Sequence, residues 1–170
     1  PSLVDGDITV FDSNAILLYL GEKSGKFMAN DTSTGRGQLY SWLMFVATGI
    51  GPYSGQAVHF QHHASEKIPY AINRYVFEAE RHYNILDDQL SKAQYMLGEQ
   101  YSIVDMCVWG WARMLPLVLG EGELEKRSNL KRLVDEINAR PAAERALTIK
   151  DRHGHAFKTE MDAQALKFMF

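Results

Sequence analysis

The chain has 170 residues, of which 46% are hydrophobic and 23% charged, the shares of an ordinary globular domain. A net charge of −3 provides no basic surface for nucleic acid, and no basic run marks an anionic membrane surface. The one cysteine, Cys107, excludes an internal disulfide. With neither a signal peptide nor a membrane span, we expect a reducing, cytoplasmic location.

The first residues predict a β-hairpin followed by a helix. Residues 2–4 and residues 8–11, of which the first three are β-branched, flank an Asp-Gly-Asp turn signal. Two strands alone are not stable in water, and the chain begins on a proline in mid-pattern, so we expect it to start inside a domain. Asp12-Ser13 then predicts a helix start, and Gly21 or Gly25 its end.

A polar linker is expected at residues 26–34, followed by a helix from about Arg36. Gly49-Ile50-Gly51-Pro52 predicts the end of that helix, because proline lacks an amide donor and clashes with the preceding turn. Residues 53–64 would then be a connection. The longest helix is expected over residues 68–90, where apolar residues recur every three or four positions.

Residues 101–117 predict a buried helix. Ser102 and Asp105 have the spacing of a capping box, and the residues that follow are apolar on nearly every face. Further helices are expected from Asn129 to Arg140 and over residues 142–149, and an amphipathic helix in the tail after Asp151. The short connections favour antiparallel packing of five or six helices.

Asp12-Ser13 is the sharpest chemical signal. A helix N-terminus attracts a carboxylate, and the Asp12 carboxylate attracts an ammonium group, so the pair suits the headgroup of an amino acid. The alternative is a plain helix cap.

Two other groups of residues have competing interpretations. Cys107 lies in the predicted buried helix and is interpreted as a small core residue rather than a reactive thiol. His59, His62 and His63 suggest a metal site, but no cysteine or well-spaced carboxylate completes the ligand set, which favours a polar loop and no metal.

Taken together, residues 1–25 resemble the end of the thioredoxin-like domain of glutathione transferases, where a proline, two strands, an acidic-Ser pair and a helix follow one another. The capping box and its buried helix resemble the family's C-terminal domain, as does the helix that closes at Pro141. The resemblance implies a mainly α fold: a C-terminal remnant of the thioredoxin-like, glutathione-binding domain at 1–25, a linker at 26–34 and an all-helical C-terminal domain at 35–170.

The middle of the chain is similar to the Nu-class branch of bacterial transferases, which binds glutathione and includes members that reduce disulfides with it. The similar segments are residues 42–45, 51–56, 59–60 and 66–75.

The resemblance also implies roles for particular residues. Asp12 and Ser13 match the acidic-Ser pair that holds the γ-glutamyl end of glutathione, although many relatives have Glu at the position of Asp12. Arg74 matches an arginine that approaches the bound glutathione, with a solvated charge on a helix face as the alternative. Tyr53 is the best candidate to contact the second substrate. Pro1 matches the family's cis-proline, and the family's thiol-activating group is expected upstream of it, so no catalytic residue is assigned.

The resemblance therefore implies a glutathione transferase of the EC 2.5.1.18 type, with glutathione as co-substrate and an electrophile or a disulfide as second substrate. It also implies a homodimer with helices 36–49 and 66–90 in its interface. Two alternatives remain open at this point: a binding or regulatory protein that keeps the fold without turnover, and a remnant with incomplete function.

Overall fold

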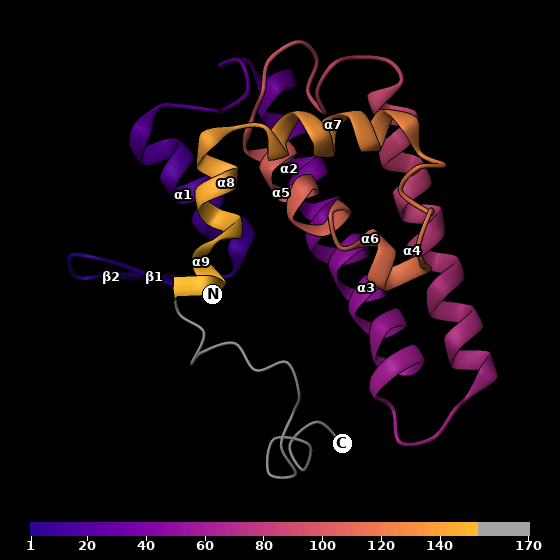
Figure 1. Ribbon diagram of the computed structural model, residues 1–170. Helices are drawn as coiled ribbons and strands as arrows, with labels where there is room; N and C mark the ends of the chain where they lie inside the picture. Colours follow the sequence, from indigo (N-terminus) through magenta and orange to yellow (C-terminus); the bar gives the residue numbers. More distant parts are fainter. Residues whose placement is uncertain (153–170) are drawn as a thin grey trace. The chain divides into compact units, whose positions relative to one another are not determined.

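The computed structural model describes residues 1–152, apart from the side chain of Lys150. By their contacts the residues form two compact units, 1–134 and one that begins at Asp135. The elements in chain order are β1 (Ser2–Asp5), β2 (Ile8–Phe11), α1 (Ser13–Ser24), α2 (Ser33–Phe45), η1 (Val46–Ile50), α3 (Gly51–Val58), η2 (His59–His63), α4 (Pro69–Leu90), α5 (Ile103–Ala112), α6 (Leu115–Leu119), α7 (Ser128–Asn138), α8 (Pro141–Leu147) and α9 (Ile149–Arg152). Figure 1 shows these elements along the chain.

The predicted hairpin is confirmed. Strands β1 and β2 pair antiparallel, with Ser2 opposite Phe11 and Asp5 opposite Ile8. Gly6 takes the first turn position with a φ of 60°, a conformation that glycine adopts without steric cost. The Asp5 carboxylate at the end of β1 accepts a hydrogen bond from the Tyr19 hydroxyl at 2.8 Å, which joins the hairpin to α1.

The predicted helix break at Gly49–Pro52 is wrong, and so is the predicted connection at residues 53–64. The chain is helical without interruption from Ser33 to His63, because the π-helical turn η1 takes the place of the break and a second π-helical turn, η2, follows α3. In η1 the amide of Gly51 donates to the carbonyl of Val46, five residues back. This wider turn precedes Pro52 and lets the helix continue past a residue that has no amide to donate.

The long helix and the buried helix are confirmed, with one change at the end of the latter. Helix α4 begins at Pro69, packs along α3 (Figure 1) and buries Ala79, Tyr83, Leu86 and Leu90. Helix α5 ends at Ala112 rather than near Pro116. Pro116 instead lies in the first turn of the separate helix α6, a position where its missing amide costs nothing. The tail helix that the sequence predicts after Asp151 lies outside the described residues.

The capping box of α5 is built on a buried carboxylate. One oxygen of Asp105 accepts from the Met96 amide at 2.8 Å, and the other accepts from the Ser102 amide and hydroxyl, each at 2.8 Å. Burial raises the pKa of the Asp105 carboxyl, and the hydrogen bonds from Met96 and Ser102 oppose that rise. The carboxylate thereby joins the loop after α4 to the start of α5.

Replacing Asp105 by Ala should lower the free energy of unfolding by about 3 kcal/mol, because three buried donors lose their acceptor. Urea denaturation followed by far-UV circular dichroism measures the change. Asp88→Ala, at an exposed position of α4, is the matched control and should change the free energy by less than about 0.5 kcal/mol. Equal losses in the two variants would contradict the structural role of Asp105.

Candidate functional site

Asp12 lies between β2 and α1 in a strained backbone conformation. Its φ is 73° and its ψ 134°, although it is not a glycine. Such a conformation costs on the order of 1–3 kcal/mol and is found mainly where function or surrounding structure requires it. The carboxylate oxygen Oδ1 accepts from the amides of Asn14 at 2.8 Å and Ala15 at 3.1 Å, so Asp12 is the N-cap of α1. The other oxygen, Oδ2, takes part in neither bond.

Ser13 is the first residue of α1 and is exposed. It lines a pocket of about 220 Å³ together with Asn14 and Leu17 from its own helix. The facing wall comes from α5, and its residues are Met106, Cys107, Gly110 and Trp111. Asp12 and Ser13 are neighbours in the chain, and the structure adds a small pocket beside Ser13 whose lining does not include Asp12.

Asn14 is a residue that the sequence analysis missed. It is buried, and its side chain contacts both α2 and α5. Nothing in the local sequence distinguishes it from an ordinary first-turn residue, because its partner Cys107 is 93 positions away.

The Cys107 thiol donates to the side-chain oxygen of Asn14 at a distance of 2.7 Å. Burial raises the pKa of this thiol to about 12, and the negative charge of Asp12 acts in the same direction. The thiol is therefore protonated at neutral pH, in agreement with its interpretation as a core residue.

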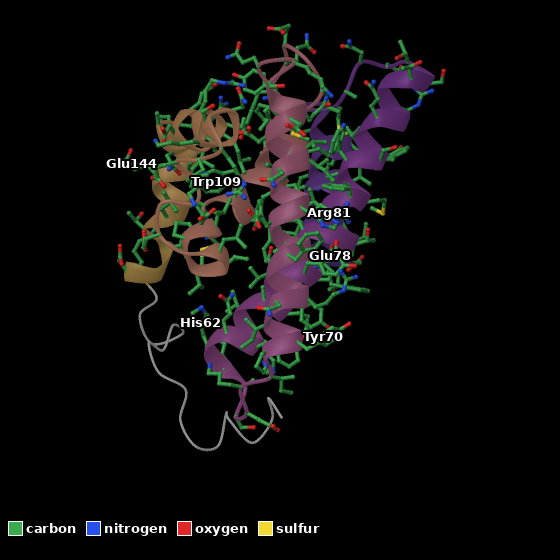
Figure 2. The ribbon with its side chains drawn as sticks, turned by 90° about the vertical axis from the view of Figure 1, so that its right-hand side faces the viewer. His62, Tyr70, Glu78, Arg81, Trp109 and Glu144 are labelled. Carbon is green, nitrogen blue, oxygen red and sulfur yellow. The ribbon has the colours of Figure 1, made fainter. Side chains whose placement is uncertain are left out.

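Arg74 lies on α4 and is not among the residues that line the pocket beside Ser13. Its guanidinium pairs with the buried carboxylate of Glu78, which also accepts two hydrogen bonds from Arg81, at 3.0 and 2.8 Å. Figure 2 shows Glu78 and Arg81 close together on α4. The two arginines lower the pKa of the Glu78 carboxyl. Arg74 is thus both exposed on the helix face and ion-paired with Glu78.

Tyr53 lies on α3 and is half-buried. Its ring packs against α4, with ring centroids 4.9 Å from His82 and 6.5 Å from Tyr75. The structure does not bring Tyr53 to the pocket beside Ser13.

The three histidines lie on the π-helical turn η2 rather than in a loop. A ring nitrogen of His62 lies 3.3 Å from the Leu117 carbonyl of α6. Across residues 1–152, no group of three or more His, Cys, Asp or Glu side chains is placed to hold a metal ion. In the same residues, no helix is long and apolar enough to cross a membrane.

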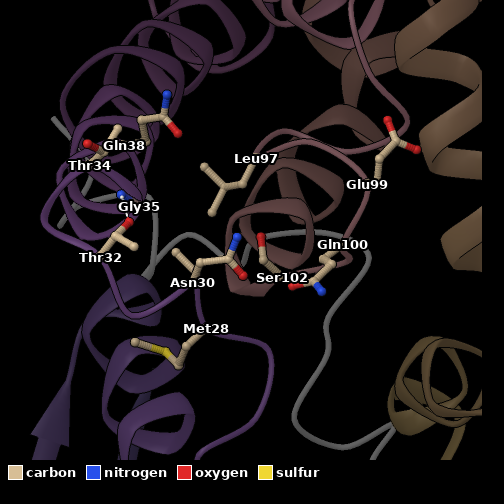
Figure 3. Close-up of a pocket in the computed structure, with 11 residues that line it drawn as sticks. Met28, Asn30, Thr32, Thr34, Gly35, Gln38, Leu97, Glu99, Gln100 and Ser102 are labelled. Carbon is tan, nitrogen blue, oxygen red and sulfur yellow. Dashed lines mark hydrogen bonds between the residues drawn. The ribbon is translucent and has the colours of Figure 1, made fainter.

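A larger pocket, of about 430 Å³, lies between the linker, the start of α2 and the loop before α5 (Figure 3). Neutral polar side chains dominate its lining, including Asn30, Thr34, Gln38 and Gln100. None of the site residues predicted from the sequence lines it.

Comparisons with known proteins define the family. Residues 65–141 match the model of the glutathione S-transferase C-terminal domain. The chain is 31% identical to the glutathione transferase URE2P6 from Phanerochaete chrysosporium, which was solved in complex with oxidized glutathione. The match covers 87% of this chain and 70% of that one, with a TM-score of 0.77. This chain belongs to the glutathione S-transferase family.

Two bacterial members of the glutathione S-transferase family are also similar to it. The disulfide-bond oxidoreductase YfcG of Escherichia coli is 38% identical over 140 residues, which are 82% of this chain and 64% of that protein. The glutathione transferase YghU of Streptococcus pneumoniae, solved with glutathione, is 32% identical over 88% of this chain and 60% of that one, with a TM-score of 0.79. This chain thus spans about three fifths of the length of these relatives.

We expect Cys107 to resist alkylation in the folded protein, because only the thiolate reacts and the pKa near 12 keeps its fraction low. At pH 8 iodoacetamide should modify the native chain at least ~100-fold more slowly than the chain in urea, where the thiol has its ordinary pKa. Mass spectrometry measures both rates, with Cys107→Ala as the blank. Similar rates in the two states would show that the thiol is accessible and ionised.

Proposed function

We propose that this chain is a glutathione transferase of the EC 2.5.1.18 type. The observation that carries the proposal is the placement of Asp12 and Ser13 at the start of α1, with Asp12 held in a strained conformation and Ser13 exposed beside a pocket. Family membership supports it, since the solved structure of the pneumococcal relative contains glutathione and that of the fungal relative contains oxidized glutathione.

The chemistry of the pair matches the γ-glutamyl end of glutathione, which carries a carboxylate and an ammonium group. The ligand carboxylate would accept from the amide and hydroxyl of Ser13, at the positive end of a helix of 12 residues. The ligand ammonium would pair with Oδ2 of Asp12, because Oδ1 is used by the two amides of α1. Asp12 therefore serves both as helix cap and as ligand anchor.

The reaction we propose is attack by the glutathione sulfur on an electrophile or on a disulfide. The name of the Escherichia coli relative, a disulfide-bond oxidoreductase, supports attack on a disulfide. The names of the solved relatives, which are glutathione transferases, support attack on an electrophile. The step requires a group that stabilises the glutathione thiolate, and we assign that role to no residue of this chain. Cys107 is unsuited to it, because its thiol is buried and already donates to the side-chain oxygen of Asn14.

We further propose the division of the chain into a thioredoxin-like part at 1–25, a linker at 26–34 and a helical part at 35–170. A Nu-class assignment rests on the similar segments in the middle of the chain.

Arg74 remains our candidate for a second glutathione contact, and Tyr53 for the second-substrate contact. The buried single cysteine is compatible with a cytoplasmic location.

A homodimer is proposed from the exposed face of α4. Tyr70 and Phe77, which are 79% and 60% exposed, alternate there with Arg74 and Arg81 at helical spacing. Figure 2 labels Tyr70 and Arg81 on this helix. Tyr and Arg are enriched in protein interfaces, and exposed aromatic side chains favour burial against a partner.

Titration calorimetry should detect saturable binding of glutathione that Ser13→Ala weakens by about 1–3 kcal/mol, because the ligand carboxylate loses a donor. Ser41→Ala is the matched control, since the Ser41 hydroxyl is exposed and donates to the Gly37 carbonyl of its own helix. We expect the control to bind as the parent chain does. Equal affinities in parent and Ser13→Ala would mean that the pair is a helix cap without a ligand role.

Sedimentation equilibrium should give the mass of two chains for the parent and of one chain for Phe77→Glu, because a carboxylate in place of the exposed phenyl ring opposes burial of this face. Leu117→Glu, at a similarly exposed apolar position on α6, is the control and should leave the dimer intact. Loss of the dimer in Leu117→Glu but not in Phe77→Glu would contradict the placement of the interface on α4.

A further inference from the structure

Asn14 connects its own helix α1 to α2 and α5, and it also contacts Asp12, the proposed anchor for the ligand ammonium. Its backbone amide donates to Oδ1 of Asp12 at 2.8 Å. Its side-chain nitrogen donates to the Leu43 carbonyl of α2 at 3.3 Å, and its side-chain oxygen accepts from the Cys107 thiol of α5 at 2.7 Å. The residue is 7% exposed, so these bonds are largely shielded from water.

The buried residues of α1 are Asn14 at its start and Gly21 near its end. Gly21 is a close-packing contact, where an added Cβ would lie 2.5 Å from the sulfur of Met28. Asn14 is the polar contact, and it lies beside Asp12 and Ser13. The end of the helix therefore packs closely on the linker, and its start, near the candidate site, is attached to α2 and α5 by the hydrogen bonds of Asn14.

The spacing of α1 and α5 also sets the width of the pocket beside Ser13. Ser13 and Asn14 form one wall, and Met106, Gly110 and Trp111 form the other. Because the Asn14–Cys107 bond joins the two walls, its loss would let the wall that carries Ser13 move relative to α5.

We propose that Asn14, held by the Cys107 thiol, is a positioning residue for the glutathione headgroup. This inference rests on the proposed function, in which Asp12 and Ser13 bind the γ-glutamyl end. Asn14 does not contact the ligand. It fixes the start of α1 against α2 and α5, so that the Ser13 hydroxyl and Oδ2 of Asp12 face the ligand in one arrangement.

Cys107 contributes a hydrogen-bond donor to the Asn14 side chain. The side-chain nitrogen Nδ2 of Asn14 donates to the Leu43 carbonyl, so the side-chain oxygen Oδ1 is the atom that faces α5. This oxygen is an acceptor and requires a donor. A protonated thiol is such a donor without adding a charge. A serine hydroxyl can replace it in this role, and an alanine methyl group cannot.

The test compares Asn14→Ala, Cys107→Ala and Cys107→Ser with the parent chain by calorimetric titration of glutathione. Asn14→Ala and Cys107→Ala should each weaken binding about ten-fold, whereas Cys107→Ser should stay within about three-fold of the parent. Because Asn14 is proposed to act through Ser13 and Asp12, Asn14→Ala should weaken binding by less in a Ser13→Ala background, where only the Asp12 contact is left to misplace, than in the parent chain. Additive losses would overturn the positioning role.

A second measurement needs no ligand. Hydrogen exchange of the peptide amides at residues 12–18 should be faster by about ten-fold in Asn14→Ala and Cys107→Ala, because the start of α1 opens more often. It should keep its parent rate in Cys107→Ser, and the peptides of α4 should keep theirs in every variant. Unchanged exchange at residues 12–18 in folded Cys107→Ala would overturn the inference. Absence of glutathione binding by the parent chain would instead contradict the proposed function, and the exchange data would still decide the role of Asn14.

Discussion

The buried carboxylate of Asp105 is the interaction on which the unit of residues 1–134 depends. It accepts three hydrogen bonds at the start of α5 and so fixes where this helix enters the core. The next amide, that of Ile103, donates to the carbonyl of Phe27, which places the linker at the same point. Loop, linker and helix therefore meet at one capping box, and the location of every residue along α5 follows from it.

Helix α5, placed in this way, contacts several other helices of the unit of residues 1–134. The Cys107 thiol donates to Asn14 of α1, and Trp111 packs closely on the start of α3, where a Cβ added to Gly51 would lie 3.1 Å from the Trp111 ring. The Tyr83 hydroxyl of α4 donates to the Trp111 carbonyl at 3.3 Å. One apolar helix thus contacts the candidate site on one side and the helical bundle on another. Its composition, apolar on nearly every face, is what such a position requires.

Local signals in the sequence predicted the hairpin, the long helix α4 and the capping box, because each depends on residues close together in the chain. The π-helical turns could not be predicted this way. Their register depends on distant contacts such as that of Gly49, where an added Cβ would lie 2.5 Å from the His82 ring. The same limit applies to the site: adjacency made Asp12 and Ser13 visible, whereas the positive φ of Asp12 and the Asn14–Cys107 bond arise from tertiary structure. The cluster of Arg74 and Glu78 lies between these cases, because the spacing permits an ion pair without requiring one.

The polar groups around Asp12 divide by charge in a way that suits an ammonium ligand. The exposed member, Asp12, is a carboxylate, and the buried members that hold it, Asn14 and Cys107, are neutral. A buried cation in their place would pair with Asp12 and compete with the ligand, and a buried anion would repel the Asp12 carboxylate. The negative charge of Asp12 itself opposes ionisation of the Cys107 thiol. The proposed anchor therefore helps to keep its own support neutral, and its charge stays available to the ligand.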